Sequence, residues 1–119
     1  MSEAAPPTVE REAVRAIILT PERELLLLHK RLGGRSFWLT PGGGMAPGES
    51  VFECLRRELH EELGVERFEL GPLIFRCHFT IDWRDHRVHQ REHYFAIELP
   101  RFTPTMRDPV ERLTVDEMR

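Results

Sequence analysis

Runs of aliphatic residues mark out the strands that this chain is expected to form. Residues 12–19 and 24–31 are two such runs, and Pro21 lies in the short polar stretch between them, so we expect two strands joined by a tight turn. Two longer strands are predicted over residues 67–82 and 88–99, with the polar residues 82–87 as their hairpin loop.

Residues 51–63 carry a helical pattern with both ends marked. Ser50 is a favourable N-cap, and Glu53 three residues later completes a capping box. Gly64 suits the left-handed conformation that ends many helices. One apolar stripe follows the helix, formed by Phe52, Leu55, Leu59 and Leu63. A single helix among strands predicts an α+β fold with a partly mixed sheet.

The segment between the second strand and the helix is rich in glycine. Residues 32–49 include the run Gly42–Gly44 and two prolines, so we expect a shaped loop, interrupted by a short strand around Phe37–Leu39. Phe37 and Trp38 are expected in the core. Residues 100–109 carry three prolines and are expected to be irregular.

Length and composition limit the class of protein. The 119 residues suffice for one domain, expected over 11–119 after a loose tail at 1–10. No membrane-spanning run or secretory signal is present in the sequence, which favours a cytoplasmic protein without a membrane partner. Two cysteines are too few for a disulfide framework. The net charge of −3 argues against stable nucleic-acid binding.

Three glutamates gather on one side of the predicted helix. Glu58 stands three and four residues before Glu61 and Glu62, spacings at which like charges repel. Both later glutamates lie in the last turn, where the helix dipole also disfavours anions. A solvated polar face is one interpretation. A bound cation is the other, and oxygen ligands of this kind indicate Mg²⁺ or Mn²⁺.

The glycine-rich segment and the acidic helix together form one long motif. From residue 43 the sequence reads GGMAPGESVFECLRRELHEELGV. This resembles the Nudix box, the signature of the Nudix hydrolase family, at every specified position: Gly43, Glu49, Arg57, Glu58, Leu59, Glu61, Glu62, Gly64 and Val65.

The resemblance implies a fold and an activity. Nudix hydrolases are α/β/α sandwiches with a mixed sheet, and they cut a pyrophosphate bond in a nucleoside diphosphate linked to another moiety, with divalent metal. The residues implied as metal ligands or catalytic groups are Glu58, Glu61, Glu62 and the carbonyl of Gly42. Those implied to support the box are Gly43, Glu49, Arg57 and Gly64, with Glu49 and Arg57 forming a salt bridge. The family does not fix which glutamate is the general base.

Candidates outside the box are weaker. Glu92 is a further metal ligand or an exposed strand glutamate. Arg31 and Trp83 are candidate substrate-binding residues. Cys54 is expected to be a small buried residue. A zinc site is weighed against ordinary surface histidines for His78, His86, His89 and His93.

Two classes of function stay open from the sequence. The first is a metal-dependent acid-anhydride hydrolase acting on a small nucleotide derivative. The alternative is a non-catalytic Nudix-like domain for nucleotide sensing or interaction, although such domains usually lack box glutamates that this chain retains. The substrate is not indicated.

The end of the sequence is expected to lack a family element. Only ten residues follow Pro109, too few for the strand and second long helix of the Nudix sandwich. Residues 113–115 are predicted to be a short strand. One sheet face, over 13–19 or 95–99, should therefore carry exposed apolar side chains, which favours a homodimer, a swapped segment or poor solubility.

Overall fold

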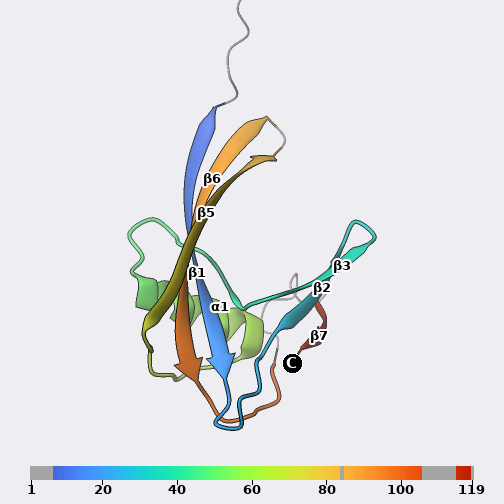
Figure 1. Ribbon diagram of the computed structural model, residues 1–119, viewed down its shortest axis with the longest axis vertical. Coiled ribbons are helices and arrows are strands. Elements are labelled where there is room, and N and C mark those ends of the chain that lie inside the picture. The colour runs from blue at the N-terminus through green and yellow to red at the C-terminus, as the bar shows by residue number, and fades with distance from the viewer. Residues whose placement is uncertain (1–6, 84, 106–114, 119) are drawn as a thin grey trace, which may run out of the picture.

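The computed structural model describes residues 7–83, 85–105 and 115–118, which form two sheets and one helix (Figure 1). The larger sheet has the order β4-β1-β6-β5, with β4 at Gly42–Gly44, β1 at Thr8–Leu19, β6 at His86–Glu98 and β5 at Leu73–Trp83. The smaller sheet has the order β3-β2-β7, with β3 at Arg35–Leu39, β2 at Leu28–Leu32 and β7 at Val115–Met118.

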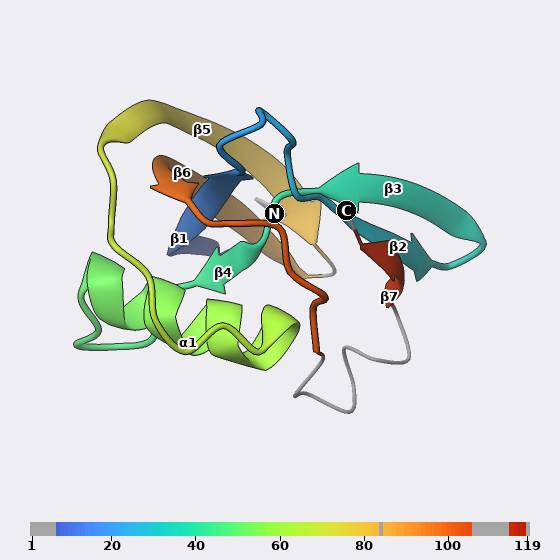
Figure 2. The same ribbon diagram turned by 90° about the horizontal axis from the view of Figure 1, so that it is seen from below.

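The larger sheet is mixed, as the sequence predicts. β1 runs parallel to β6, while β4 pairs antiparallel with β1 and β5 pairs antiparallel with β6. One helix, α1, spans Val51–Leu63 and lies across one face of this sheet (Figure 2). The predicted mixed sheet with a single helix is therefore confirmed, and no second helix occurs among the residues described.

Helix α1 has the predicted bounds and caps. The Ser50 side chain accepts a hydrogen bond from the Glu53 amide, and the Glu53 side chain accepts one from the Ser50 amide. Gly64 adopts φ 76° at the C-terminus. Phe52 departs from the predicted apolar stripe. It is half-exposed and packs on Phe68, because the segment after the helix runs back beside the first helical turn.

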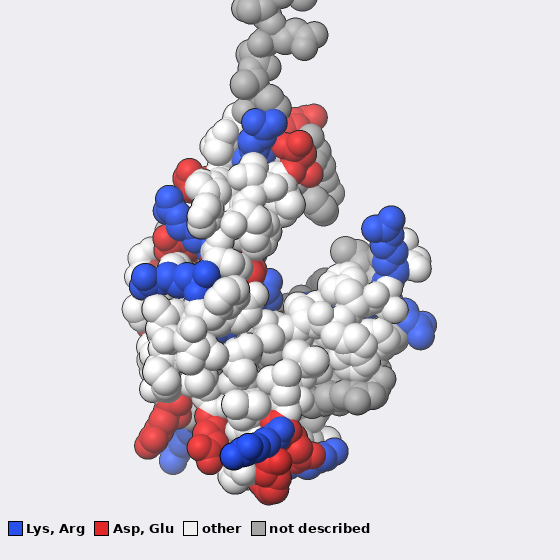
Figure 3. Space-filling model, in the orientation of Figure 1, with Lys and Arg blue, Asp and Glu red and all other residues white. Residues whose placement is uncertain are grey.

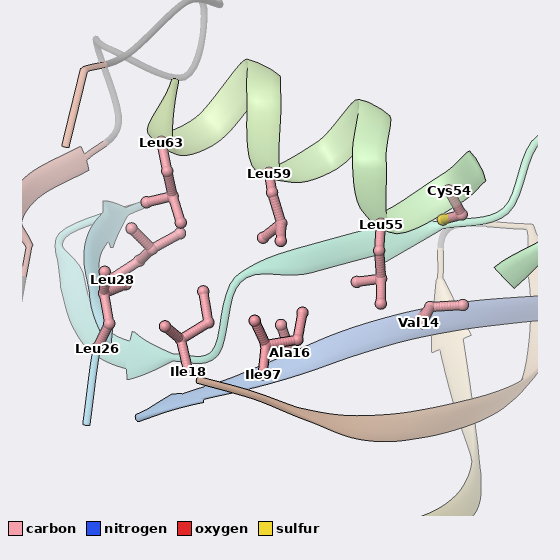
Figure 4. Packing of buried hydrophobic residues seen from close by; sticks show 10 residues of the cluster. All are labelled: Val14, Ala16, Ile18, Leu26, Leu28, Cys54, Leu55, Leu59, Leu63 and Ile97. Atoms are coloured by element: carbon pink, nitrogen blue, oxygen red, sulfur yellow. The ribbon is translucent and has the colours of Figure 1, made fainter. Parts of the chain in front are cut away.

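The core lies between α1 and the larger sheet (Figure 4). It is formed by Val14, Ala16, Ile18, Leu26, Leu28, Cys54, Leu55, Leu59, Leu63 and Ile97. Cys54 is fully buried there, as expected. Because this apolar cluster presses the helix against β1 and β4, it fixes where the glutamates of the helix lie relative to the glycine strand.

Several strand bounds differ from the predictions. β1 begins at Thr8, inside the expected tail, because residues 8–11 pair with β6; residues 1–6 of that tail lie outside the described part. The expected strand 24–31 starts only at Leu28, preceded by a single bridge between Leu19 and Leu25. The predicted 82–87 loop is largely strand, since β5 continues to Trp83 and β6 begins at His86.

The short strand expected around Phe37–Leu39 is present as part of β3, but the loop predicted for the rest of 32–49 is wrong at Gly42–Gly44. These three glycines form β4, which pairs with residues 13–15 of β1. A Cβ on Gly42 would collide with the Val14 carbonyl oxygen, so the close pairing of the two backbones depends on glycine.

Large apolar side chains are also placed differently from expectation. Phe37 and Trp38, predicted in the core, are half-exposed on β3, because that strand belongs to the smaller sheet and Trp38 stacks on His29 instead. The exposed apolar residues of the larger sheet lie mostly on β5 rather than over 13–19 or 95–99: Leu73, Ile74, Phe75, Phe79 and Ile81. Residues 113 and 114 of the predicted last strand lie outside the described part, and β7 begins at Val115.

Candidate active site

Glu62 connects the last turn of α1 to the glycine strand. Its side chain is only 4% exposed, and its Oε1 accepts a 2.8 Å hydrogen bond from the Gly42 amide. Lys30 Nζ, on β2, stands 3.8 Å from the other carboxylate oxygen. Two elements therefore hold this carboxylate against the backbone of the strand that precedes the helix.

Glu58 lies one turn earlier, against the neighbouring glycine. A Cβ built on Gly43 would stand 2.6 Å from Glu58 Oε1, so the absence of a side chain at Gly43 makes room for the carboxylate. Arg57 Nη1 donates a 2.8 Å hydrogen bond to the same oxygen. Glu58 and Glu62 thus border adjacent residues of one glycine strand.

The pair of Arg57 and Glu49 closes the loop before the helix. Arg57 donates hydrogen bonds of 2.7 and 2.9 Å to the two oxygens of Glu49, and a third of 3.1 Å to the Gly44 carbonyl. The Arg57 guanidinium and the Ala46 amide lower the pKa of Glu49 to about 2. The salt bridge that the resemblance implies is present in the structure.

Glu61 is set apart from the other two helix glutamates. Its side chain is 41% exposed, and its nearest ionic partner is Arg57 Nη1 at 3.7 Å. Among the residues described, no three His, Cys, Asp or Glu side chains come together as a metal-binding group. Glu58 and Glu62, by contrast, both lie against the backbone of the glycine strand.

Glu92 is buried in β6, so the interpretation as an exposed strand glutamate is wrong. Gln90 Nε2 and the Tyr94 hydroxyl donate hydrogen bonds of 2.8 and 2.9 Å to its two oxygens, and Arg15 Nε stands 3.3 Å away. Burial alone would raise the pKa of Glu92, but these hydrogen bonds and the Arg15 charge lower it overall. Glu92 is therefore an ionised, buried carboxylate.

Arg15 joins Glu92 to the glycine strand. Its Nη1 donates 3.3 Å hydrogen bonds to the carbonyls of Gly42 and Thr40. Sequence reasoning missed Arg15, Gln90 and Tyr94. A signal for two of them existed, because Gln90, Glu92 and Tyr94 alternate along a strand and must share a face.

The other candidates are less closely tied to this site. Arg31 is exposed on β2, and the side chain of Trp83 lies outside the described part. His78 and His89 meet edge to face at 5.6 Å, and His89 Nδ1 stands 3.2 Å from Glu10. Burial, together with the charges of Glu49 and Glu58, raises the pKa of the Cys54 thiol to about 11, which does not suit a nucleophile.

The donor set fits a hard divalent cation. Carboxylates of Glu58 and Glu62 and carbonyls of the glycine strand offer only oxygen, the ligand that Mg²⁺ and Mn²⁺ prefer. The space left by the missing side chain at Gly43 lets one carboxylate approach the backbone. No thiolate or imidazole belongs to this set, which argues against zinc.

The fold and this arrangement define a Nudix domain, and the profile of the NUDIX domain family matches residues 9–118. The chain therefore belongs to the Nudix family. Among its relatives, an RNA pyrophosphohydrolase of Cellvibrio japonicus (strain Ueda107) is 47% identical over 75 residues, which make up 63% of this chain and 42% of that protein. The nucleoside triphosphatase NudI of Enterobacter sp. (strain 638) is 61% identical over 42 residues, 33% of this chain and 29% of that protein.

Solved structures share the fold at low sequence identity. A MutT protein from Methanosarcina mazei Go1 superimposes with a TM-score of 0.70 at 21% identity, over 98% of this chain and 78% of that one. The E. coli dihydroneopterin triphosphate pyrophosphohydrolase gives 0.73 at 17% identity, over 91% and 77%. The chain spans less than half the length of the two curated relatives named above. No helix in the described residues has the length and apolarity to cross a bilayer.

Proposed function

We propose that this chain hydrolyses a pyrophosphate bond in a nucleoside diphosphate linked to another moiety, with Mg²⁺ or Mn²⁺. The observation that carries the proposal is the placement of Glu58 and Glu62 against adjacent glycines of β4. Nudix hydrolases generally use divalent metal ions, and the oxygen donors found here suit such ions.

Each residue of the site has a proposed role. Glu58, Glu62 and the Gly42 carbonyl would hold the metal, with Glu61 as a ligand or the general base and Glu92 as a candidate ligand from outside the helix. The metal supplies charge neutralisation for the phosphoryl oxygens and a lowered pKa for water. Glu61 is the most exposed of the three helix glutamates, which suits a group that removes a proton from solvent water. The salt bridge between Arg57 and Glu49 would hold the loop before α1 against the helix.

The substrate class is tested with compounds suggested by the relatives. Two of these are named for RNA pyrophosphohydrolysis and nucleoside triphosphate hydrolysis, so pyrophosphate-bearing RNA and nucleoside triphosphates join nucleotide sugars and dinucleoside polyphosphates in the panel. The sequence argues against stable nucleic-acid binding. Turnover of RNA would show that RNA is nevertheless bound for long enough to react. A cytoplasmic location and a homodimer stay predictions.

The decisive experiment measures phosphate products from this panel with Mg²⁺, with Mn²⁺ and with a chelator. We expect turnover of at least one compound only with metal. In Glu62→Gln the shape of the side chain and its acceptor for the Gly42 amide are kept while one charge is removed, so turnover should fall about 100-fold or more.

The matched control is Glu66→Gln, an exposed glutamate two residues beyond the helix cap. It should keep wild-type turnover. Metal-independent hydrolysis, or full activity in Glu62→Gln, would contradict the proposal. A folded protein that binds nucleotides but hydrolyses none of the panel would favour the non-catalytic alternative.

A further inference from the structure

The guanidinium of Arg15 occupies the position between two oxygens of the site. Its Nη1 donates to the Gly42 carbonyl and its Nε to Glu92 Oε2, both at 3.3 Å. The Arg15 and Glu92 side chains are 18% and 9% exposed. One positive charge therefore bridges a carbonyl and a carboxylate that come from strands far apart in the sequence.

Arg15 interacts with Glu92 mainly through its positive charge and less through its hydrogen bond. Both carboxylate oxygens already accept shorter hydrogen bonds from neutral donors, Gln90 at 2.8 Å and Tyr94 at 2.9 Å. The 3.3 Å contacts of Arg15 are long for charge-assisted hydrogen bonds. A different cation could replace the guanidinium while the hydrogen bonds from Gln90 and Tyr94 stay in place.

We propose that Arg15 is a positioning residue that competes with the divalent cation for the Gly42 carbonyl and the Glu92 carboxylate. The inference rests on the proposed function, because it takes both groups as metal ligands. A divalent cation binds such oxygens at about 2.1 Å. Two cations on one carbonyl repel each other strongly where solvent is largely excluded. Arg15 must therefore leave the carbonyl when the metal binds. The free-energy cost of breaking its contacts with Gly42 and Glu92 lowers the affinity for the metal.

The first test measures the Kd of Mn²⁺ by electron paramagnetic resonance with wild type and Arg15→Gln. Removing the competing charge should tighten Mn²⁺ binding at least tenfold. Arg15→Lys keeps the charge and should stay within threefold of wild type. The control is Arg87→Gln, an exposed arginine of β6. Arg87 Nε stands 3.2 Å from Asp82, so its removal should leave the Kd within twofold.

A second readout follows Arg15 directly in the wild-type protein. In wild-type protein, Mg²⁺ is titrated while the ¹H–¹⁵N signal of Arg15 Nε is followed, with the signal assigned from its loss in Arg15→Lys. Displacement predicts a large shift towards the position of a solvated arginine, at the same Mg²⁺ concentration that saturates binding. A signal that does not move at saturating Mg²⁺ would overturn the proposal.

The outcomes separate this inference from the proposed function. Unchanged or weaker Mn²⁺ binding by Arg15→Gln, with a wild type that binds Mn²⁺ and hydrolyses substrate, overturns the role of Arg15 alone. A wild type that binds neither Mn²⁺ nor Mg²⁺ overturns both. Tighter binding in Arg15→Gln and not in Arg87→Gln, with the Mg²⁺-dependent shift of Arg15, supports the competition.

Discussion

Glu49 links the ionisation of one carboxyl group to the folding of the loop before α1. In the folded chain its pKa is lowered from 4.5 to about 2, because Arg57 and the Ala46 amide donate hydrogen bonds to the carboxylate. Since the folded pKa is depressed, the stabilisation is fully present above pH 4.5 and is lost as the pH falls towards 2.

The resulting prediction concerns Glu49→Gln. The variant should be less stable than wild type at pH 7, and the difference between the two should shrink as the pH falls from 4.5 to about 2. Urea unfolding at several pH values measures this difference. Glu66→Gln is the control, because it removes an exposed carboxylate outside the loop before α1. A Glu49→Gln deficit that is constant down to pH 2 would contradict the argument.

Single residues also show where sequence reasoning stops. The salt bridge of Arg57 and Glu49 was predictable because a short motif fixes the spacing of both residues. The buried position of Glu92 was not predictable, because its charged partner Arg15 is 77 residues away in the sequence. Trp38 was misplaced for a similar reason, since its stacking partner His29 lies on a strand whose sheet the sequence does not define.

At the scale of elements, β4 is the least conventional strand of the fold. It consists of three glycines and has no side chains, so nothing in its hydrophobic pattern marks it as a strand. Helix α1, by contrast, carries its boundaries in Ser50, Glu53 and Gly64, whose roles are local. Local signals therefore predicted the helix to the residue, while β4 depends on its contact with β1.

Alanine at two adjacent positions of β4 should have different effects. A Cβ on Gly42 would meet the backbone of β1 at a φ of 134°, so Gly42→Ala should cost about 3 kcal/mol or more of unfolding free energy. The atoms nearest to a Cβ on Gly43 would be the end of the Glu58 side chain, which can move aside. Gly43→Ala should therefore cost about 1 kcal/mol or less while weakening metal binding.

Urea unfolding and Mn²⁺ titration of both variants check this prediction. Each variant is the control for the other, because the two substitutions are chemically identical. Equal loss of stability at both positions would mean that β4 tolerates no side chain anywhere. Unchanged metal binding in a stable Gly43→Ala protein would remove Glu58 from the proposed ligand set.

At the scale of the whole molecule, one face of the larger sheet exposes several large apolar side chains. The face opposite α1 is turned towards the viewer in Figure 3. The part of this face over the upper ends of β1, β5 and β6 carries few charged side chains except along the edges. Phe75, Phe79 and Ile81 of β5 share this face, and each is at least 39% exposed. Contiguous apolar surface of this kind favours association.

We predict concentration-dependent self-association through this face. The double variant Phe75→Ser with Phe79→Ser should shift the protein towards monomer in sedimentation velocity runs, and the association of wild type should persist at 0.5 M salt because it is apolar. Leu70→Ser, an exposed leucine before β5, is the control and should leave association unchanged. A wild type that is monomeric at all concentrations would contradict the prediction.

The parallel pairing of β1 with β6 has a consequence for the timing of folding. Arg11 and Gln90, one of the register pairs, are 79 residues apart in the chain. The central ladder therefore cannot close until β6 has been synthesised, whereas β4 and α1, the other partners of β1, emerge earlier. Non-local closure of this kind is slow, so in the growing chain the β1 edge that pairs with β6 stays without its partner strand for a long interval.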